Sequence, residues 1–211
     1  MPIKKACEGI YRILVPFEEL YTTVYAAVGE EGVALIDSAT YPSDIRNYIL
    51  PALRELGISD DAVKYILLSH LHGDHAGGAT ELCRALPNAV PRAFEPCDLP
   101  GLSMLSDSEI LLGFLQAVKL PGHAHHSGGF LDLRHGTLLS ADCLQLYGVG
   151  KYTNGIFLPD EYEKSIEKIK NLGLKRIVAA HDYEPLGAIA EGEAEVKKYL
   201  DTCLDALKNK K

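Results

Sequence analysis

Four separate runs of aliphatic residues in this chain each stop at a histidine or an aspartate. They lie in LLSHLHGDHAGG (67–78), VKLPGHAHHSGG (118–129), TLLSADCL (137–144) and IVAAHDYEPLG (177–187). A fifth run, ALIDSAT (34–40), ends at Asp37. Unpaired charge is costly inside a buried strand, so ionisable side chains gathered at strand ends indicate a site on one rim of a sheet. The pattern predicts a sheet-based fold with a polar site along that rim.

Strand-like and helix-like patterns alternate along the chain. Strands are predicted over residues 10–15, 22–28, 33–36, 64–68, 117–120, 129–133, 137–141 and 176–180, and helices over 42–56, 79–86, 160–172 and 193–207. Pro51 is expected to kink or interrupt the first helix, because proline lacks the N–H that the helix needs. The proline-rich stretch 87–116 is expected to form a lid over the site. We expect one layered α/β domain over residues 1–211.

Composition narrows the classes of partner and the compartment. The formal net charge of −8 argues against binding to a phosphate backbone, so no nucleic acid is expected. No apolar run is long enough for a membrane span or a secretory signal, so no membrane partner is expected. The five cysteines form no CxxC pair, which favours a reducing compartment, and we expect a cytoplasmic protein with a small-molecule substrate. The sequence sets no oligomeric state.

The segment SHLHGDHAGG (69–78) holds the densest group of side chains that can bind metal. His70 and His72 are two residues apart, so in an extended loop both point the same way and can bind one cation. Asp74 and His75 follow within one turn of an expected helix start and face elsewhere, which suits a second cation. Imidazole and carboxylate are ligands of zinc, iron and manganese, and two such cations about 3.5–4 Å apart hold a bridging hydroxide.

This segment resembles the HxHxDH motif of the metallo-β-lactamase-fold hydrolase superfamily, which includes glyoxalase II and the lactonases. PGHAHHSGG (121–129) is similar to the turn of that superfamily that carries a later histidine ligand, here His123. Asp142, after Ser140-Ala141, matches the metal-bridging aspartate, and His181 matches the last histidine ligand. The resemblance covers residues 34–185 and implies an αββα sandwich, with two mixed sheets flanked by helices and the site at one edge.

The resemblance also implies the metal ligands. One ion would be held by His70, His72 and His123, and the other by Asp74, His75 and His181, with Asp142 bridging the two. Asp37 is expected to orient a ligand rather than to bind metal itself. Asp74 or Asp142 is expected to handle the proton as the catalytic residue, and the sequence leaves that choice open. Two divalent ions are expected, zinc first, with iron or manganese as the other candidates.

A hydrolase that attacks an ester-type carbonyl (thioester, lactone or related) with a metal-bridging hydroxide is the function that the resemblance implies. The apolar residues of the expected lid favour an acyl or otherwise apolar substrate, and they are Leu99, Leu102, Met104, Leu105 and Phe114. A mononuclear iron oxidoreductase of the sulfur-dioxygenase type stays open as the alternative, because such enzymes keep the same histidine and aspartate letters. A metal-binding module without turnover is a third reading, and phosphodiester cleavage is a fourth. No substrate-binding residue is predicted.

Overall fold

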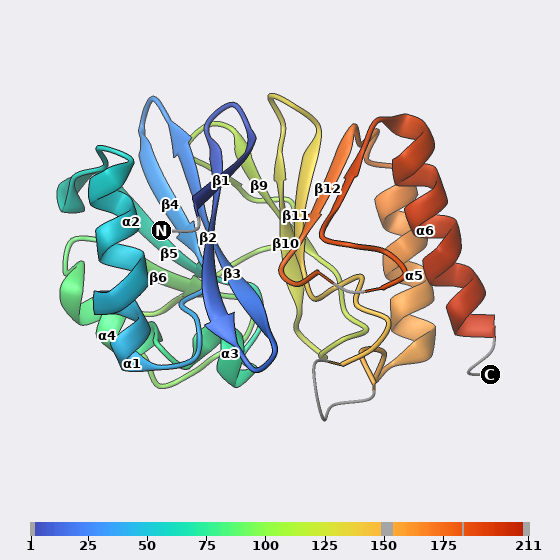
Figure 1. The fold of residues 1–211 in the computed structure, drawn as a ribbon, viewed down its shortest axis with the longest axis horizontal. Helices are drawn as coiled ribbons and strands as arrows, with labels where there is room; N and C mark the ends of the chain where they lie inside the picture. The colour runs from blue at the N-terminus through green and yellow to red at the C-terminus, as the bar shows by residue number, and fades with distance from the viewer. Residues whose placement is uncertain (1–2, 149–153, 183, 209–211) are drawn as a thin grey trace.

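Two β-sheets pack face to face in the computed structural model, and helices cover the outer face of each (Figure 1). The structure describes residues 3–148, 154–182 and 184–208. This is the αββα sandwich with two mixed sheets that the resemblance implied, so the predicted fold class is confirmed. Within the described residues, no helix combines the length and apolar character that crossing a bilayer requires.

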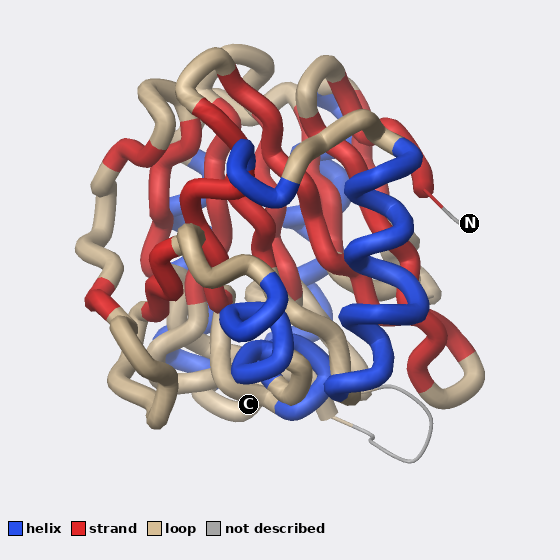
Figure 2. Tube along the Cα trace, turned by 90° about the vertical axis from the view of Figure 1, so that its left-hand side faces the viewer, coloured by secondary structure: helices blue, strands red, loops and turns tan. Residues whose placement is uncertain are grey.

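The first sheet has seven strands in chain order. They are β1 (Ile3–Cys7), β2 (Ile10–Phe17), β3 (Leu20–Gly29), β4 (Gly32–Ile36), β5 (Val63–Leu68), β6 (Val90–Ala93) and β7 (Ser103–Met104). The β1 to β4 pairings are antiparallel, and the β4 to β7 pairings are parallel. Helices on its outer face pack their apolar side chains against it. Figure 2 looks onto this helical layer, with helices in front of the strands.

The second sheet has six strands, in the order β13-β12-β11-β10-β9-β8. They are β8 (Ile110–Leu111), β9 (Leu115–Lys119), β10 (Gly128–Asp132), β11 (Thr137–Ala141), β12 (Arg176–Ala179) and β13 (Ile189–Glu191). Helices α5 (Pro159–Lys170) and α6 (Glu193–Lys208) cover its outer face. A buried layer between the sheets, with Tyr25 and Leu67 from the first and Phe130 and Val178 from the second, holds them together. Strands of both sheets end along the lower edge of the molecule in Figure 1, so the packing of the two sheets sets the relative positions of the loops at that edge.

The helix predicted over 42–56 is interrupted, as expected from Pro51. It consists of α1 (Pro42–Asp44), a π-helical segment Ile45–Ile49 and α2 (Leu50–Glu55). The Leu50 N–H donates to the carbonyl of Ile45, five residues back, which is the wide π turn. Pro51 follows this segment directly, in the first turn of α2, so its missing N–H falls where the backbone hydrogen bonds change from the π to the α pattern.

Residues 87–116, predicted as a lid, contain β6, β7, β8 and the start of β9. Leu105 and Phe114 are buried in the layer between the sheets. These two side chains are thus used for packing, whereas Met104, which also favoured an acyl substrate in the sequence, is 45% exposed. A lid function of this segment stays a prediction.

The rim segment after β5 needs glycine because another loop lies against it. Helix α3 (Gly73–Ala76) follows β5, and the Ser38 N–H donates to the carbonyl of His75 (2.7 Å). A Cβ placed on Gly77 would lie 2.1 Å from the carbonyl oxygen of Thr40, which is closer than any real contact. The two backbone segments can approach this closely only without a side chain at residue 77.

Gly77→Ala is therefore expected to destabilise the protein by about 1–3 kcal/mol, because the loop at Thr40 must move. Gly73→Ala is the matched control, since a Cβ at Gly73 meets no atom within 4 Å. Denaturant unfolding of the metal-free proteins measures both changes. Equal unfolding free energies for the two variants would contradict the expectation.

Candidate metal centre

The side chains singled out in the sequence come together at one rim from separate segments of the chain. His70 and His72 follow β5, and Asp74 and His75 lie on α3. The others follow strands of the second sheet, and they are His123 after β9, Asp142 after β11 and His181 after β12. The predicted ligand atoms fall into two groups, and within each group these atoms lie within 4.8 Å of one another.

The first group consists of His70, His72 and His123. His72 Nδ1 lies 3.0 Å from His70 Nε2 and 2.9 Å from His123 Nε2, so three ring nitrogens converge on one point. His70 and His123 are buried, whereas His72 is exposed to the cleft. Burial lowers the pKa of both buried rings, which keeps them in the neutral form that binds metal.

The second group consists of Asp74, His75, Asp142 and His181. His75 Nε2 lies 3.4 Å from Asp74 Oδ2 and 3.3 Å from Asp142 Oδ2. His181 Nε2 lies 3.2 Å from Asp74 Oδ2 and 3.3 Å from Asp142 Oδ1. Asp142 Oδ2 is also 3.5 Å from His123 Nε2, so this carboxylate touches both groups.

Hydrogen bonds behind the rings set which nitrogen faces the site. His123 Nδ1 donates to the carbonyl of Gly155, and His181 Nδ1 donates to the carbonyl of Tyr21, each at 2.7 Å. A carbonyl oxygen can only accept, so the proton of each neutral ring lies on Nδ1 and the Nε2 lone pair faces inward. These carbonyl contacts are the orienting interactions that metal-binding histidines use.

Asp37 lies behind His75 and is completely buried. Its Oδ2 accepts hydrogen bonds from His75 Nδ1 (2.7 Å) and from Ser69 Oγ (2.9 Å), and its Oδ1 accepts one from the Ser69 N–H (2.8 Å). It contacts a ring of the second group from the side away from the site, as expected of a residue that orients a ligand. The sequence did not predict the hydrogen-bonding role of Ser69, whose hydroxyl also lies 3.0 Å from His70 Nδ1.

The donor set fits two divalent cations. His75 Nε2 and Asp142 Oδ1 are buried and make no hydrogen bond within the described part of the chain. Burial works to raise the pKa of Asp142, yet the charges of His181 and His75 outweigh it and hold this pKa well below its usual value. Despite burial, the charges of Asp142 and Asp74 raise the pKa of His75, and Asp142 raises the pKa of His181 to about 9, so protons on these rings balance the two carboxylates in the metal-free protein. A divalent cation can replace those protons, which leaves carboxylate oxygens and Nε2 lone pairs facing it.

An open cleft of about 450 Å³ lies beside the two groups. Its floor includes His72, Asp74, His123 and Asp142, and its walls include Phe17, Glu18, Tyr41, Gln145, Asn154 and Phe157. The Phe157 ring centre is 5.5 Å from that of His123. The sequence predicted none of these wall residues individually, because they lie in loops or, for Phe17, at the end of β2, outside any metal-binding motif.

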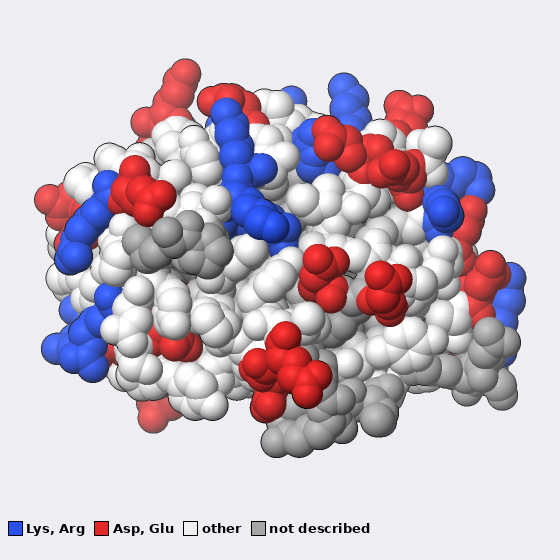
Figure 3. Space-filling view, viewed as in Figure 1, with Lys and Arg blue, Asp and Glu red and all other residues white. Residues whose placement is uncertain are grey.

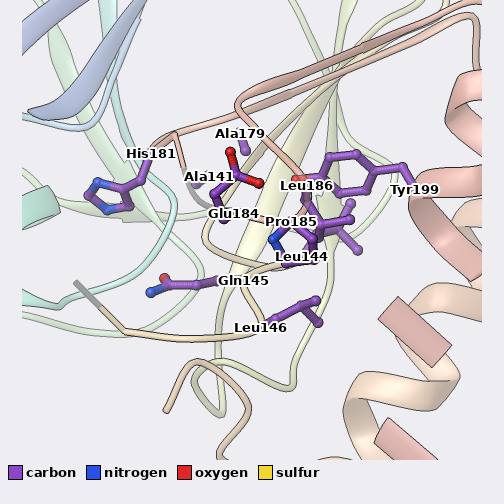
Figure 4. Close-up of a pocket in the computed structure, with 10 residues that line it drawn as sticks. All are labelled: Ala141, Leu144, Gln145, Leu146, Ala179, His181, Glu184, Pro185, Leu186 and Tyr199. Atoms are coloured by element: carbon purple, nitrogen blue, oxygen red, sulfur yellow. The ribbon is translucent and has the colours of Figure 1, made fainter. Parts of the chain in front are cut away.

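A second, much smaller crevice lies on the other side of His181 (Figure 4). Its volume of about 10 Å³ has room for roughly one water molecule. Figure 4 shows the His181 ring pointing away from the other lining residues, which include Glu184 and Tyr199. The larger cleft is therefore the one that can admit a substrate to the metal-binding side chains.

A third group of possible metal ligands has atoms at similar distances from one another, but it has a structural role. It consists of Cys7, Asp132 and His135. Asp132 Oδ1 accepts hydrogen bonds from the Arg134 N–H (2.9 Å) and from Arg134 Nε (3.0 Å). Asp132 Oδ2 accepts one from His135 Nδ1 (2.8 Å). The guanidinium already balances this carboxylate, so the group stabilises the turn between β10 and β11.

Comparisons with known proteins agree with this geometry. A sequence profile of the Metallo-beta-lactamase superfamily matches residues 18–93. The uncharacterized protein YobT of Bacillus subtilis is 31% identical over 150 residues, which are 59% of this chain and 62% of that protein. A hydroxyacylglutathione hydrolase of Vibrio campbellii is 30% identical over 138 residues, which are 63% of this chain and 53% of that enzyme. The chain thus matches less than two thirds of the length of either relative.

Among solved structures, a metallo-beta-lactamase family protein from Thermus thermophilus superimposes with a TM-score of 0.71 at 21% identity. The match covers 94% of this chain and 79% of that one, and it speaks for the fold alone. The matched profile and the distant relatives show that this chain is similar in sequence to the metallo-beta-lactamase superfamily, and its αββα architecture is the fold of that superfamily's solved structures.

Proposed function

We propose that this protein is a dinuclear metal-dependent hydrolase that opens an ester-type carbonyl, such as that of a thioester or a lactone. The position of Asp142 carries the proposal, because it lies within 3.5 Å of imidazole nitrogens from both groups at the floor of an open cleft. A carboxylate shared in this way suits two neighbouring cations better than one. His70, His72 and His123 would hold one ion, and Asp74, His75 and His181 the other.

Two divalent cations, when bound, polarise the carbonyl under attack and lower the pKa of water toward neutrality. The chain's own residues then orient the reactants and move the proton. The Asp74 side chain is 15% exposed and lines the cleft, whereas that of Asp142 is 5% exposed and is enclosed by His75 and His181. We therefore assign proton transfer to Asp74: its Oδ2, which faces His75 and His181, would hold the metal, and its other carboxylate oxygen takes the proton of the attacking water and delivers it to the departing thiolate or alkoxide as the acyl bond breaks.

We propose zinc as the resident metal, with iron and manganese compatible with the same nitrogen and oxygen donors. We also propose a single domain, since the two sheets share one buried layer. A small-molecule substrate fits the cleft volume of about 450 Å³, which lies in the usual range for such sites. The cytoplasmic location stays a prediction.

Metal removal and reconstitution test the proposal directly. Chelator-treated protein should lose hydrolysis of a panel of thioesters, lactones and carboxylic esters, and added zinc should restore it with two ions bound per chain by elemental analysis. One iron per chain with oxygen uptake on a persulfide would replace the hydrolase by the oxidoreductase alternative. Full metal occupancy without turnover of any panel member would favour a binding module.

A further inference from the structure

The walls of the cleft contain an unusual selection of side chains for an enzyme with an anionic substrate. Beyond the two metal-binding groups, the described residues that line it are aromatic, amide, hydroxyl, glycine and one carboxylate. No lysine or arginine is among these described lining residues, and the one further charged side chain is Glu18. Binding sites for carboxylates and phosphates normally present arginine or lysine to the anion.

Glu18 stands where it can act on a bound substrate. It lies in the turn between β2 and β3, with a positive φ of 48°, and it lines the cleft. Within the described part of the chain, Glu18 has no ion-pair partner. Figure 3 shows a group of acidic side chains at the lower centre, where Figure 1 has this hairpin. No neighbour among the described residues therefore neutralises the negative charge at this side of the cleft.

Aromatic rings form the other walls. Tyr41 is 61% exposed and Phe157 is 54% exposed, and both line the cleft. Phe17, beside Glu18, lies with its ring centre 6.0 Å from that of His181. Exposed aromatic rings beside a polar centre favour apolar groups by area and cations through the ring face. The Glu18 carboxylate and the aromatic rings thus both favour cationic ligands, and the carboxylate disfavours anionic ones.

We propose that this cleft selects its substrate by the charge of the leaving group, taking cationic and neutral thioesters or esters in preference to anionic ones, with Glu18 as the selecting residue. This inference rests on the proposed hydrolase function. It separates this chain from the hydroxyacylglutathione hydrolases to which it is similar, since a glutathione thioester brings an anionic leaving group.

Three thioesters with the same butyryl group test the inference. Their leaving thiols are thiocholine (cationic), N-acetylcysteamine (neutral) and glutathione (anionic), and a thiol reagent reports the release of each. With the zinc-reconstituted protein at low ionic strength, kcat/KM should fall in that order, with a difference of about three- to tenfold for each unit of charge near Glu18. Raising the salt to about 0.5 M should reduce the differences, because the screening length shortens.

Variants assign the effect to one carboxylate. Glu18→Gln should bring the three kcat/KM values closer together, and Glu18→Lys should make the glutathione thioester a better substrate than the thiocholine ester. Glu19→Gln is the matched control, because Glu19 is the exposed neighbour that does not line the cleft. It should leave the order as in the parent protein.

Binding of the three non-hydrolysable thioether analogues, measured by calorimetry, separates this inference from the proposed function. A cationic-over-anionic order in binding without any hydrolysis would sustain charge selection and overturn the hydrolase. Hydrolysis in which the glutathione thioester equals or exceeds the neutral one, or an order unchanged in Glu18→Gln, would overturn charge selection and leave the hydrolase standing. Absence of any charge order in both hydrolysis and binding would also overturn it.

Discussion

Asp142→Asn is expected to lower kcat/KM for a hydrolysed ester or thioester by about 10³-fold, equivalent to about 4 kcal/mol of lost transition-state stabilisation. The side chain reaches His75, His123 and His181, so its negative charge serves both metal-binding groups. An amide keeps the shape but removes the charge that attracts two cations, and it presents an N–H₂ donor toward ring nitrogens. Bound metal should therefore fall at both groups together.

Elemental analysis after dialysis against a defined zinc concentration measures this loss, and circular dichroism checks the fold. Asp201→Asn is the control, since Asp201 lies on α6 and its partner is Lys197 at the surface. The control should keep full metal content and activity. Loss of a single ion from Asp142→Asn, with the other bound as tightly as before, would show that this carboxylate does not serve both groups.

Removal of the Asp37 carboxylate should have the largest effect on stability. Asp37→Ala leaves three buried donors without their acceptor, namely the Ser69 N–H, the Ser69 hydroxyl and His75 Nδ1. Each such group costs free energy when it is buried unsatisfied, so we expect a loss of about 3–5 kcal/mol in the free energy of unfolding. Denaturant unfolding of the metal-free protein gives the value.

Asp37→Asn distinguishes orientation from packing. The amide can keep one hydrogen bond with Ser69, but an N–H₂ group facing His75 Nδ1 favours the ring tautomer with its proton on Nε2, which cannot bind metal. Metal affinity should fall by about 10- to 100-fold, as for other residues that orient a ligand. Asp44→Asn is the control, because Asp44 is also buried but accepts from the Thr40 and Tyr41 N–H groups rather than from a histidine. Equal metal affinity in Asp37→Asn and the parent would refute the orienting role.

Many of the strands and helices could be predicted from the sequence, because each depends on a pattern of neighbouring residues. Aliphatic runs that stop at a polar residue predicted β4, β5, β11 and β12, and Pro51 predicted that the helix over 42–56 would be irregular, as the π-helical segment between α1 and α2 shows. Short edge strands such as β7 and β8 were not predicted, because two-residue strands have no periodicity of their own. Their pairing depends on the neighbouring strands, which sequence patterns do not place.

In the metal site, too, some features follow from the local sequence and others depend on tertiary packing. The spacing of His70, His72, Asp74 and His75 is fixed by the chain itself, so the sequence alone determined that metal-binding side chains would gather after one strand. Only the tertiary structure decided what surrounds them: the carbonyls of Tyr21 and Gly155 that orient two rings, and the Glu18 and Phe157 walls of the cleft. The orienting carbonyls are far from their partners along the chain, as Gly155 is 32 residues from His123. Their positions follow from how the two sheets pack, and packing is a property of the whole buried layer rather than of any local run of residues.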